Sequence, residues 1–186
     1  QALAAGGVDA VIATGAEAAG HRVSFLAPPE DSLVGTFALV PQVVDAVDVP
    51  VIAAGGIADR RGVAAAFALG ASGVQVGTAF LRTRQSAATA GHRRAITHAH
   101  DTSAVLTRAM SGRLARGIPN AAMRLLEQHE ILPFPAQNWL TGQFRAAAAQ
   151  QGRADLVSLW AGQAAALSVY DDAADVFAEL AAGLPA

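Results

Sequence analysis

The side chain best suited to chemistry is that of His21, in the segment Ala13–Arg22 (ATGAEAAGHR). An imidazole titrates near neutral pH and can act there as a general base. Gly20, directly before it, lets a flat ligand approach the backbone closely. Taken alone, the segment favours a surface histidine in a flexible loop, and catalysis is the alternative interpretation.

Two glycine turns are the second chemical feature, at Ala54–Gly56 (AGG) and at Gln75–Thr78 (QVGT). Glycine lets backbone N–H groups come close to an anion. The loops after the last two strands of a (β/α)8 barrel commonly bind phosphate. Either turn alone could be an ordinary α/β turn, but two of them one βα unit apart favour a cradle for a phosphorylated cofactor. No G-x-G-x-x-G follows a strand, so no dinucleotide fingerprint is present.

The elements that position these residues follow from apolar runs bounded by glycine or proline. Three short runs predict parallel strands covered on both faces, at Val8–Ala13, Val51–Ala54 and Val74–Gly77. Helices are predicted over Val40–Val47, with Pro41 near the first turn, and over Arg61–Leu69, with Asp59 as N-cap and Gly70 as C′ residue. Strands that alternate with helices indicate βαβ units and a parallel sheet.

After residue 85 almost every segment has a helical pattern. The predicted helices are Ser86–His98, Asn120–Glu130, Leu140–Gln150, Asp155–Leu167 and Asp171–Ala182. Before residue 85, the connection Gly15–Leu39 is longer than the ~12–15 residues of ordinary loops, which favours an active-site loop.

Other polar residues carry weaker signals. His98 and His100 have a spacing found in some metal sites, but a solvated helix end is favoured because only Asp101 lies nearby as a further ligand, so no metal site is predicted. The arginine-rich segment Arg108–Asn120 fits an anion contact and a solvated linker equally well. Trp160 is expected to pack in the core rather than to touch a ligand.

The composition excludes several classes of function. The chain of 186 residues has no cysteine, and all 13 basic residues are arginine. Thiolate metal sites, cysteine nucleophiles and Schiff-base lysines are therefore excluded. The net charge is −2, so we expect no nucleic-acid partner. No apolar run reaches the ~18 residues of a membrane span, so we expect no membrane partner. The absence of cysteine is compatible with the cytosol, and we expect a cytoplasmic location.

Together these segments resemble the nitronate monooxygenase family (2-nitropropane dioxygenases), which are FMN-dependent (β/α)8-barrel enzymes. The resemblance runs from about Gly7 to Leu167 and is strongest in PQVVDAVDVPVIAAGGIADRRGV and GASGVQVGTAFL. The barrel segments also resemble the FMN-dependent enoyl-ACP reductases, which carry a similar histidine loop. The later segments TRAMSGRLARGIPN and LVSLWAGQAAAL favour the nitronate monooxygenases.

The resemblance implies roles for individual residues. His21 matches the base that removes the α-proton of a nitroalkane. The implied FMN-binding residues are Thr14, Ala19, Gly20, Gly55, Gly56, Gln75, Val76, Gly77 and Thr78. Three positions depart from the family pattern: Thr14 stands where glutamine is usual, and Ala19 and Val23 stand where glycine is usual.

The resemblance also implies the architecture. A (β/α)8 barrel takes ~250 residues, and the three strands match the last three of the family. We therefore expect an α/β fold consisting of a partial TIM barrel, its last three βα units, followed by C-terminal helices. Residues 1–85 would form the C-terminal part of an FMN-binding barrel, and 86–186 a helical region packed on it. The chain would be a C-terminal piece of a longer product, and its open strand edges would favour a homo-oligomer.

Three functions follow as expectations. The first is an FMN-dependent nitronate monooxygenase that oxidises nitroalkanes or nitronates with O2 and uses His21 as base. The second is an FMN-dependent NAD(P)H enoyl-ACP or quinone reductase of the same fold. The third is an inactive truncated fragment.

Overall fold

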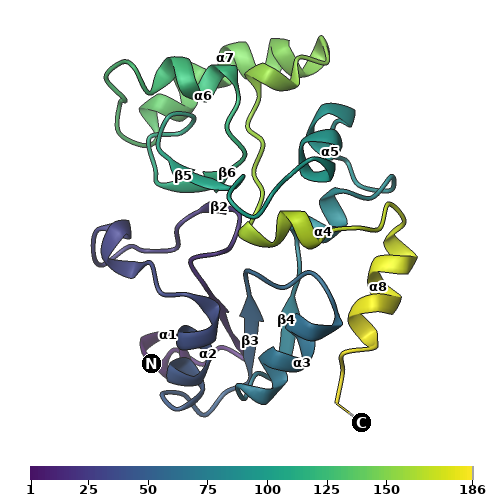
Figure 1. Cartoon of the computed structure of the whole chain (residues 1–186). Helices are drawn as coiled ribbons and strands as arrows, with labels where there is room; N and C mark the ends of the chain where they lie inside the picture. The colour runs from purple at the N-terminus through teal and green to yellow at the C-terminus, as the bar shows by residue number, and fades with distance from the viewer. Residues whose placement is uncertain (186) are drawn as a thin grey trace.

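The computed structural model describes residues 1–185, which contain two three-stranded sheets. The first is parallel, with the order β1 (Val11–Thr14), β3 (Val51–Ala54), β4 (Gly73–Gln75). It lies in the lower half of Figure 1, beside α1, α2 and α3. The prediction of three parallel strands is confirmed, although β1 begins three residues later than expected and β4 ends at Gln75. Three parallel strands do not close a barrel.

Eight α-helices and three 3₁₀ helices complete the described chain. The α-helices are α1 (Ala2–Ala5), α2 (Thr36–Val44), α3 (Arg60–Ala68), α4 (Thr78–Leu81), α5 (Ala90–Thr97), α6 (Ala121–Leu126), α7 (Ala136–Gln150) and α8 (Ala173–Ala181). The 3₁₀ helices are η1 (Pro29–Ser32), η2 (Ala154–Leu156) and η3 (Gln163–Leu167). Among residues 1–185, no helix is long and apolar enough to cross a membrane.

Local signals place both ends of helix α3. The Asp59 carboxylate accepts hydrogen bonds from the Arg61 and Gly62 N–H groups at 2.9 and 3.2 Å, which confirms the predicted N-cap of α3. Gly70 ends the same helix with φ +92°, a conformation that favours glycine. In contrast, α2 begins four residues before Val40, so Pro41 lies inside the helix rather than near its first turn.

Helices cover only one face of the parallel sheet. Ala13, Val51 and Ala53 face α2, α3 and α8 and are buried in one apolar core. The alternate residues point to the other face, where the Ile12 side chain is 54% exposed. The prediction that both faces are covered is therefore wrong for the described residues, because no element in them packs over Ile12.

The second sheet is antiparallel and was not predicted. Its order is β2 (Gly20–His21), β6 (Ala115–Gly117), β5 (Val105–Thr107). β6 pairs with β5 on one side and with β2 on the other, so it ties the histidine loop to the second half of the chain. The expectation of almost entirely helical structure after residue 85 is wrong because strand pairing depends on partners that are distant in the sequence.

The predicted helix Asp155–Leu167 is also wrong. The segment forms η2, a β-bridge from Trp160 to Gly117, and then η3. The Asn120 side-chain amide donates to the Ala154 and Val157 carbonyls at 3.1 and 2.6 Å and holds the first turn. Tertiary contacts therefore override the helical propensity of this segment.

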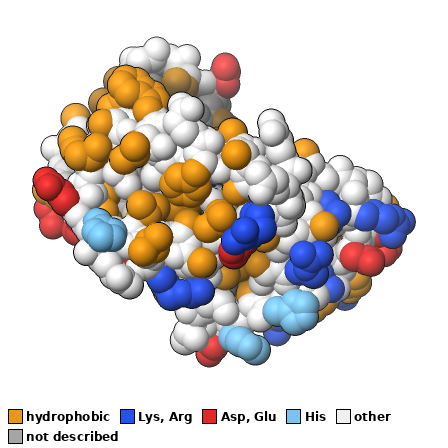
Figure 2. All heavy atoms as spheres, turned by 90° about the horizontal axis from the view of Figure 1, so that it is seen from above, with side chains coloured by type: hydrophobic (Ala, Val, Ile, Leu, Met, Phe, Trp, Pro, Cys, Tyr) orange, Lys and Arg blue, Asp and Glu red, His pale blue; other side chains and the backbone are white. Residues whose placement is uncertain are grey.

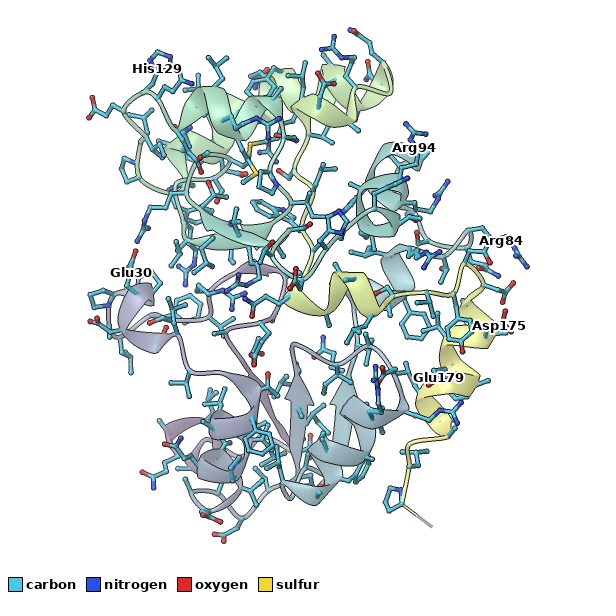
Figure 3. The ribbon with its side chains drawn as sticks, viewed as in Figure 1. Glu30, Arg84, Arg94, His129, Asp175 and Glu179 are labelled. Carbon is cyan, nitrogen blue, oxygen red and sulfur yellow. The ribbon has the colours of Figure 1, made fainter. Side chains whose placement is uncertain are left out.

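The last helix, α8, returns to the first half of the chain (Figure 1, yellow). Val176 and Leu180 pack into the same core as Val63. Arg60 and Glu179 form an ion pair of 2.6 Å across α3 and α8. Glu179 is labelled with Asp175 and Arg84 at the edge of the molecule in Figure 3.

Helices α6 and α7 lie at the top of Figure 1. Both helices carry large apolar side chains that are exposed. Leu125, Trp139 and Leu140 are each more than half exposed. The view from above shows apolar side chains gathered over part of this face, with arginines toward its other side (Figure 2).

Candidate functional site

His21 lies among side chains from three distant segments. Its Nε2 is 2.7 Å from Ser111 Oγ. Its ring meets the Phe134 ring edge-on, with the centroids 5.7 Å apart, and the Trp160 ring at a tilt, with the centroids 6.1 Å apart. The imidazole therefore has one polar partner and two aromatic walls.

Buried polar contacts hold the Ser111 segment in place. The Gln137 amide donates to the Ala109 carbonyl at 2.7 Å, and the Thr141 hydroxyl donates to the Met110 carbonyl at 2.5 Å. Both side chains are on α7 and are almost fully buried. Helix α7 thereby fixes the backbone that carries Ser111.

Gly112 brings the Phe134 turn close to that segment. A Cβ at Gly112, where φ is +81°, would lie 2.4 Å from the Leu132 carbonyl oxygen and 2.6 Å from the Phe134 nitrogen. Only glycine allows this approach, and it places Phe134 beside His21.

Positive charge surrounds His21. Burial lowers the pKa of its imidazole, and the charges of Arg113 and Arg22 lower it further. The Arg113 guanidinium donates to the Arg22 carbonyl at 2.9 Å and the Ser24 carbonyl at 2.7 Å, and it lies over the Phe25 ring. A lower pKa favours the neutral form of the imidazole, which can accept a proton.

A cavity of about 200 Å³ opens at the carboxyl end of the parallel sheet. It is lined by Thr14, Ala18, Ala19, Ala54, Gly55, Gly56, Ile57, Gln75, Gly77, Thr78, Gly162 and Ala164. Seven of the nine predicted cofactor residues are in this set, so the structure brings the two glycine turns and the loop after β1 together. Gly20 and Val76 are not.

The two remaining residues lie elsewhere for geometric reasons. Gly20 is paired with Arg116 in the antiparallel sheet. Val76 packs against the apolar core on the helix-covered side, since strand residues alternate between faces. Ala18, Ala54 and Ile57, which were not predicted, are sequence neighbours of predicted residues.

Gly162 and Ala164 were also missed. Their only signal in the sequence was the glycine in LWAGQ, which stands inside a segment with a helical pattern. The Gly162 N–H donates to Thr78 Oγ1 at 3.0 Å, and the Gln163 N–H donates to the Glu17 carbonyl at 2.9 Å. These two bonds seat the start of η3 against the cavity.

Glu17 connects the loop after β1 to the start of α2. Its carboxylate accepts from the Thr36 N–H at 2.9 Å, and the Thr36 hydroxyl lies 2.9 Å from both that carboxylate and the Gly55 carbonyl. The loop after β1, the start of α2 and the first glycine turn are thus joined at one point.

Known proteins resemble this chain over most of its length. The model of the nitronate monooxygenase family matches residues 1–183. The chain belongs to the nitronate monooxygenase family. It is 50% identical over 165 residues to a probable nitronate monooxygenase of Staphylococcus aureus (strain Newman), covering 87% of this chain and 46% of that relative.

Solved structures show the same fold. A nitroalkane oxidase from Streptomyces ansochromogenes is 40% identical with a TM-score of 0.88, over 98% of this chain and 54% of that one. FabK from Thermotoga maritima is 34% identical with a TM-score of 0.78, over 97% and 55%. The chain spans about half the length of the relatives it matches.

The cavity of this nitronate monooxygenase family member suits a phosphate group. Its lining offers two hydroxyls, one side-chain amide and several glycines, and contains no carboxylate among the described residues. Gly55 has φ +97°, and a Cβ there would lie 3.0 Å from Ala18. The close approach of the turn to the loop therefore requires glycine.

The structure also places the weaker candidates. His98 and His100 are exposed at the end of α5, and no cluster of three metal-ligating side chains occurs within residues 1–185. His92 is partly buried, with Nε2 3.0 Å from the Trp160 carbonyl. The solvated-linker interpretation of Arg108–Asn120 is wrong, because Met110 and Ala115 are fully buried.

Proposed function

We propose that this chain is part of an FMN-dependent nitronate monooxygenase that oxidises small nitroalkanes or nitronates with O2, with His21 as the base. One observation carries the proposal. His21 is two residues from the cavity residue Ala19, and its neighbour Trp160 is two residues from the cavity residue Gly162. A substrate beside the imidazole would therefore lie next to a group bound in the cavity.

The proposed chemistry begins with a proton transfer. The α C–H of a neutral nitroalkane is acidic because the nitro group delocalises the resulting negative charge. A neutral His21 takes that proton, and the lowered pKa of the imidazole keeps it available at neutral pH. The positive charges of Arg113 and Arg22 favour the nitronate anion that remains.

FMN, when bound, would supply the electron transfer to oxygen. We propose that its phosphate is held by the cavity lined by the two glycine turns and Thr14. Ala19, Gly20 and Val76 stay in the proposed cofactor set from the family pattern, of which only Ala19 lines the cavity. The glycine and hydroxyl donors of the lining support this assignment.

The first test is the visible spectrum of the purified 186-residue chain during titration with FMN. A flavin band that stays with the protein supports the cofactor assignment, and free flavin at all concentrations contradicts it. Anaerobic addition of nitronate should then bleach the band, and NADH should not.

The role of His21 is tested separately. His21→Ala should keep FMN, lose turnover of neutral nitroalkane, and retain turnover of preformed nitronate, which needs no base. His129→Ala, at the far edge of the molecule in Figure 3, is the matched control and should change neither. Unchanged turnover of neutral nitroalkane by His21→Ala would refute the base role.

A second candidate is a flavin-dependent NAD(P)H reductase, which the likeness to FabK supports. Bleaching of the flavin by NADH, and not by nitronate, would favour it. An inactive fragment would show a cooperative thermal transition without bound flavin. Association with a second copy, a cytoplasmic location and the division near residue 85 stay predictions.

A further inference from the structure

The buried guanidinium of Arg22 lies inside the loop that lines the cavity. The Arg22 side chain is almost fully buried, and the residue is 4% exposed. Its Nη1 donates to the Gly15 and Ala16 carbonyls, each at 3.1 Å. Its Nη2 donates to the Ala18 carbonyl and, at 3.2 Å, to the Gly20 carbonyl. One side chain thus donates hydrogen bonds to carbonyls along most of the loop.

A second buried arginine reinforces this arrangement. Arg116 is 6% exposed and donates from Nε to the Ala16 carbonyl at 2.9 Å and from Nη1 to the Ala104 carbonyl at 2.8 Å. No carboxylate within residues 1–185 lies at ion-pair distance from Arg22 or Arg116. Both guanidinium groups therefore donate to backbone carbonyls rather than to carboxylates, and their charges remain.

The direction of these carbonyls determines the direction of the loop N–H groups. In a planar trans peptide the C=O and the following N–H point in opposite directions. Because the Ala18 carbonyl points at Arg22, the Ala19 N–H points away from it. Ala19 and Gly162 both line the cavity, and a Cβ at Gly162 would lie 3.4 Å from the Ala19 nitrogen.

We propose that Arg22 is the positioning residue of the cofactor loop: it holds the carbonyls of Gly15, Ala16, Ala18 and Gly20 inward. The Ala19 N–H then faces the cavity as a hydrogen-bond donor to the bound ligand. The assignment of that ligand as a phosphorylated flavin rests on the proposed function. The same guanidinium holds the residues directly before His21 and so orients the imidazole. Lysine cannot replace it, because an ammonium is a point charge with three donors and lacks the planar fork of five.

The positioning role is tested first without a cofactor. In ¹⁵N-labelled chain, Arg22→Ala should shift and broaden the amide signals of residues 16–21, whereas signals from α3 and α8 stay in place. Millimolar guanidinium chloride, far below denaturing concentrations, should restore the amide signals because it refills the vacated site. Wild-type loop signals in Arg22→Ala, or loop signals that guanidinium leaves unchanged in a folded protein, would overturn the proposal.

Arg145→Ala is the matched control. Arg145 donates to the Asn138 carbonyl at 3.0 Å and, like Arg22, has a buried Nε without a partner, but it lies on α7. Its loss should leave the loop signals unchanged. If Arg22→Ala does not fold, Arg22→Lys decides the question: it keeps the charge, so native loop signals in that variant would overturn the positioning role.

The donor role is tested with FMN as the probe. The Ala19 amide signal should move on titration of the wild-type chain, and the affinity of Arg22→Lys should fall about 10- to 100-fold, the factor expected for one or two hydrogen bonds. An Ala19 signal that stays in place while FMN binds would refute the donor role. If wild type binds no FMN, the proposed function fails, and the loop signals still decide the positioning role.

Discussion

His21 Nε2 and Ser111 Oγ lie 2.7 Å apart although 90 positions separate them in the chain. Ser111 Oγ is also 3.2 Å from the Arg113 carbonyl, which can only accept. When the single hydroxyl hydrogen goes to that carbonyl, Ser111 accepts from Nε2–H, and Nδ1 carries the free lone pair of the imidazole. We therefore expect Ser111 to select the tautomer of His21.

Ser111→Ala should mix the two His21 tautomers and lower turnover of neutral nitroalkane about 10-fold, the effect of roughly 1.4 kcal/mol from one lost hydrogen bond. Imidazole ¹⁵N shifts report the tautomer directly. Ser111→Thr keeps the hydroxyl and should restore most of the rate. A His21 tautomer that is the same in Ser111→Ala and wild type would show that Ser111 has no such role.

Ser168→Ala is the control for hydroxyl removal. Ser168 is 5% exposed, and its Oγ has no hydrogen-bond partner. Removing a buried, unpaired hydroxyl should leave the free energy of unfolding unchanged or raise it by about 1 kcal/mol. Urea denaturation measures the change, and a clear loss of stability would contradict the assignment of this hydroxyl as unpaired.

Gly55→Ala should weaken flavin binding and destabilise the fold by about 1–3 kcal/mol, because φ is +97° and the new Cβ would press on Ala18. Gly152→Ala shares a positive φ, +69°, but its Cβ meets nothing within 4 Å. It should cost about 1 kcal/mol and leave flavin affinity unchanged. Flavin titration and thermal melts of the two variants separate the effect of steric crowding at the cavity from that of backbone strain. Equal flavin affinities of Gly55→Ala and Gly152→Ala would contradict a role of Gly55 in binding the cofactor.

Arg113→Gln should raise the pKa of His21, because it removes one of the two positive charges that lower it, while burial, the largest cause, remains. The imidazole pKa is lower in the folded than in the unfolded chain, where it is about 6.5. The unfolded chain therefore binds the proton more tightly, and stability falls as pH drops from about 6.5 through the folded pKa.

In Arg113→Gln, the pH range over which stability falls should become narrower, because the folded and unfolded pKa values of His21 move closer together. The rate with neutral nitroalkane should reach half its maximum at a higher pH than in the wild type. Titration of the His21 ring protons by NMR measures the shift. Arg84→Gln, at the edge of Figure 3 and paired with Asp172, is the control and should leave the His21 pKa unchanged. A lower His21 pKa in Arg113→Gln would have the wrong sign for this account.

Asp59→Ala should lower the free energy of unfolding by about 1 kcal/mol, since the Arg61 and Gly62 N–H groups lose their acceptor at the start of α3. Asp59→Asn keeps an acceptor oxygen and should recover most of the loss. The exposed Asp48 provides the control, and Asp48→Ala should change stability by less than about 0.5 kcal/mol in the same urea titrations. A loss in Asp48→Ala equal to that in Asp59→Ala would contradict the capping role.

The sequence by itself determined the features that depend on neighbouring residues. Val51–Ala54 has the predicted strand bounds, and Asp59 caps α3, because apolar runs, caps and glycine turns are local signals. The two glycine turns lie at one cavity because the carboxyl ends of parallel strands share one edge of the sheet.

Only the tertiary structure decided which distant residues complete the site. Ser111, Phe134 and Trp160 reach His21 through the pairing of β2 with β6 and the anchoring of the Ser111 segment to α7. Trp160 forms a β-bridge with Gly117, although the sequence around it favours a helix. Pairing between distant segments depends on which surfaces are buried together, and no window of neighbouring residues contains that information.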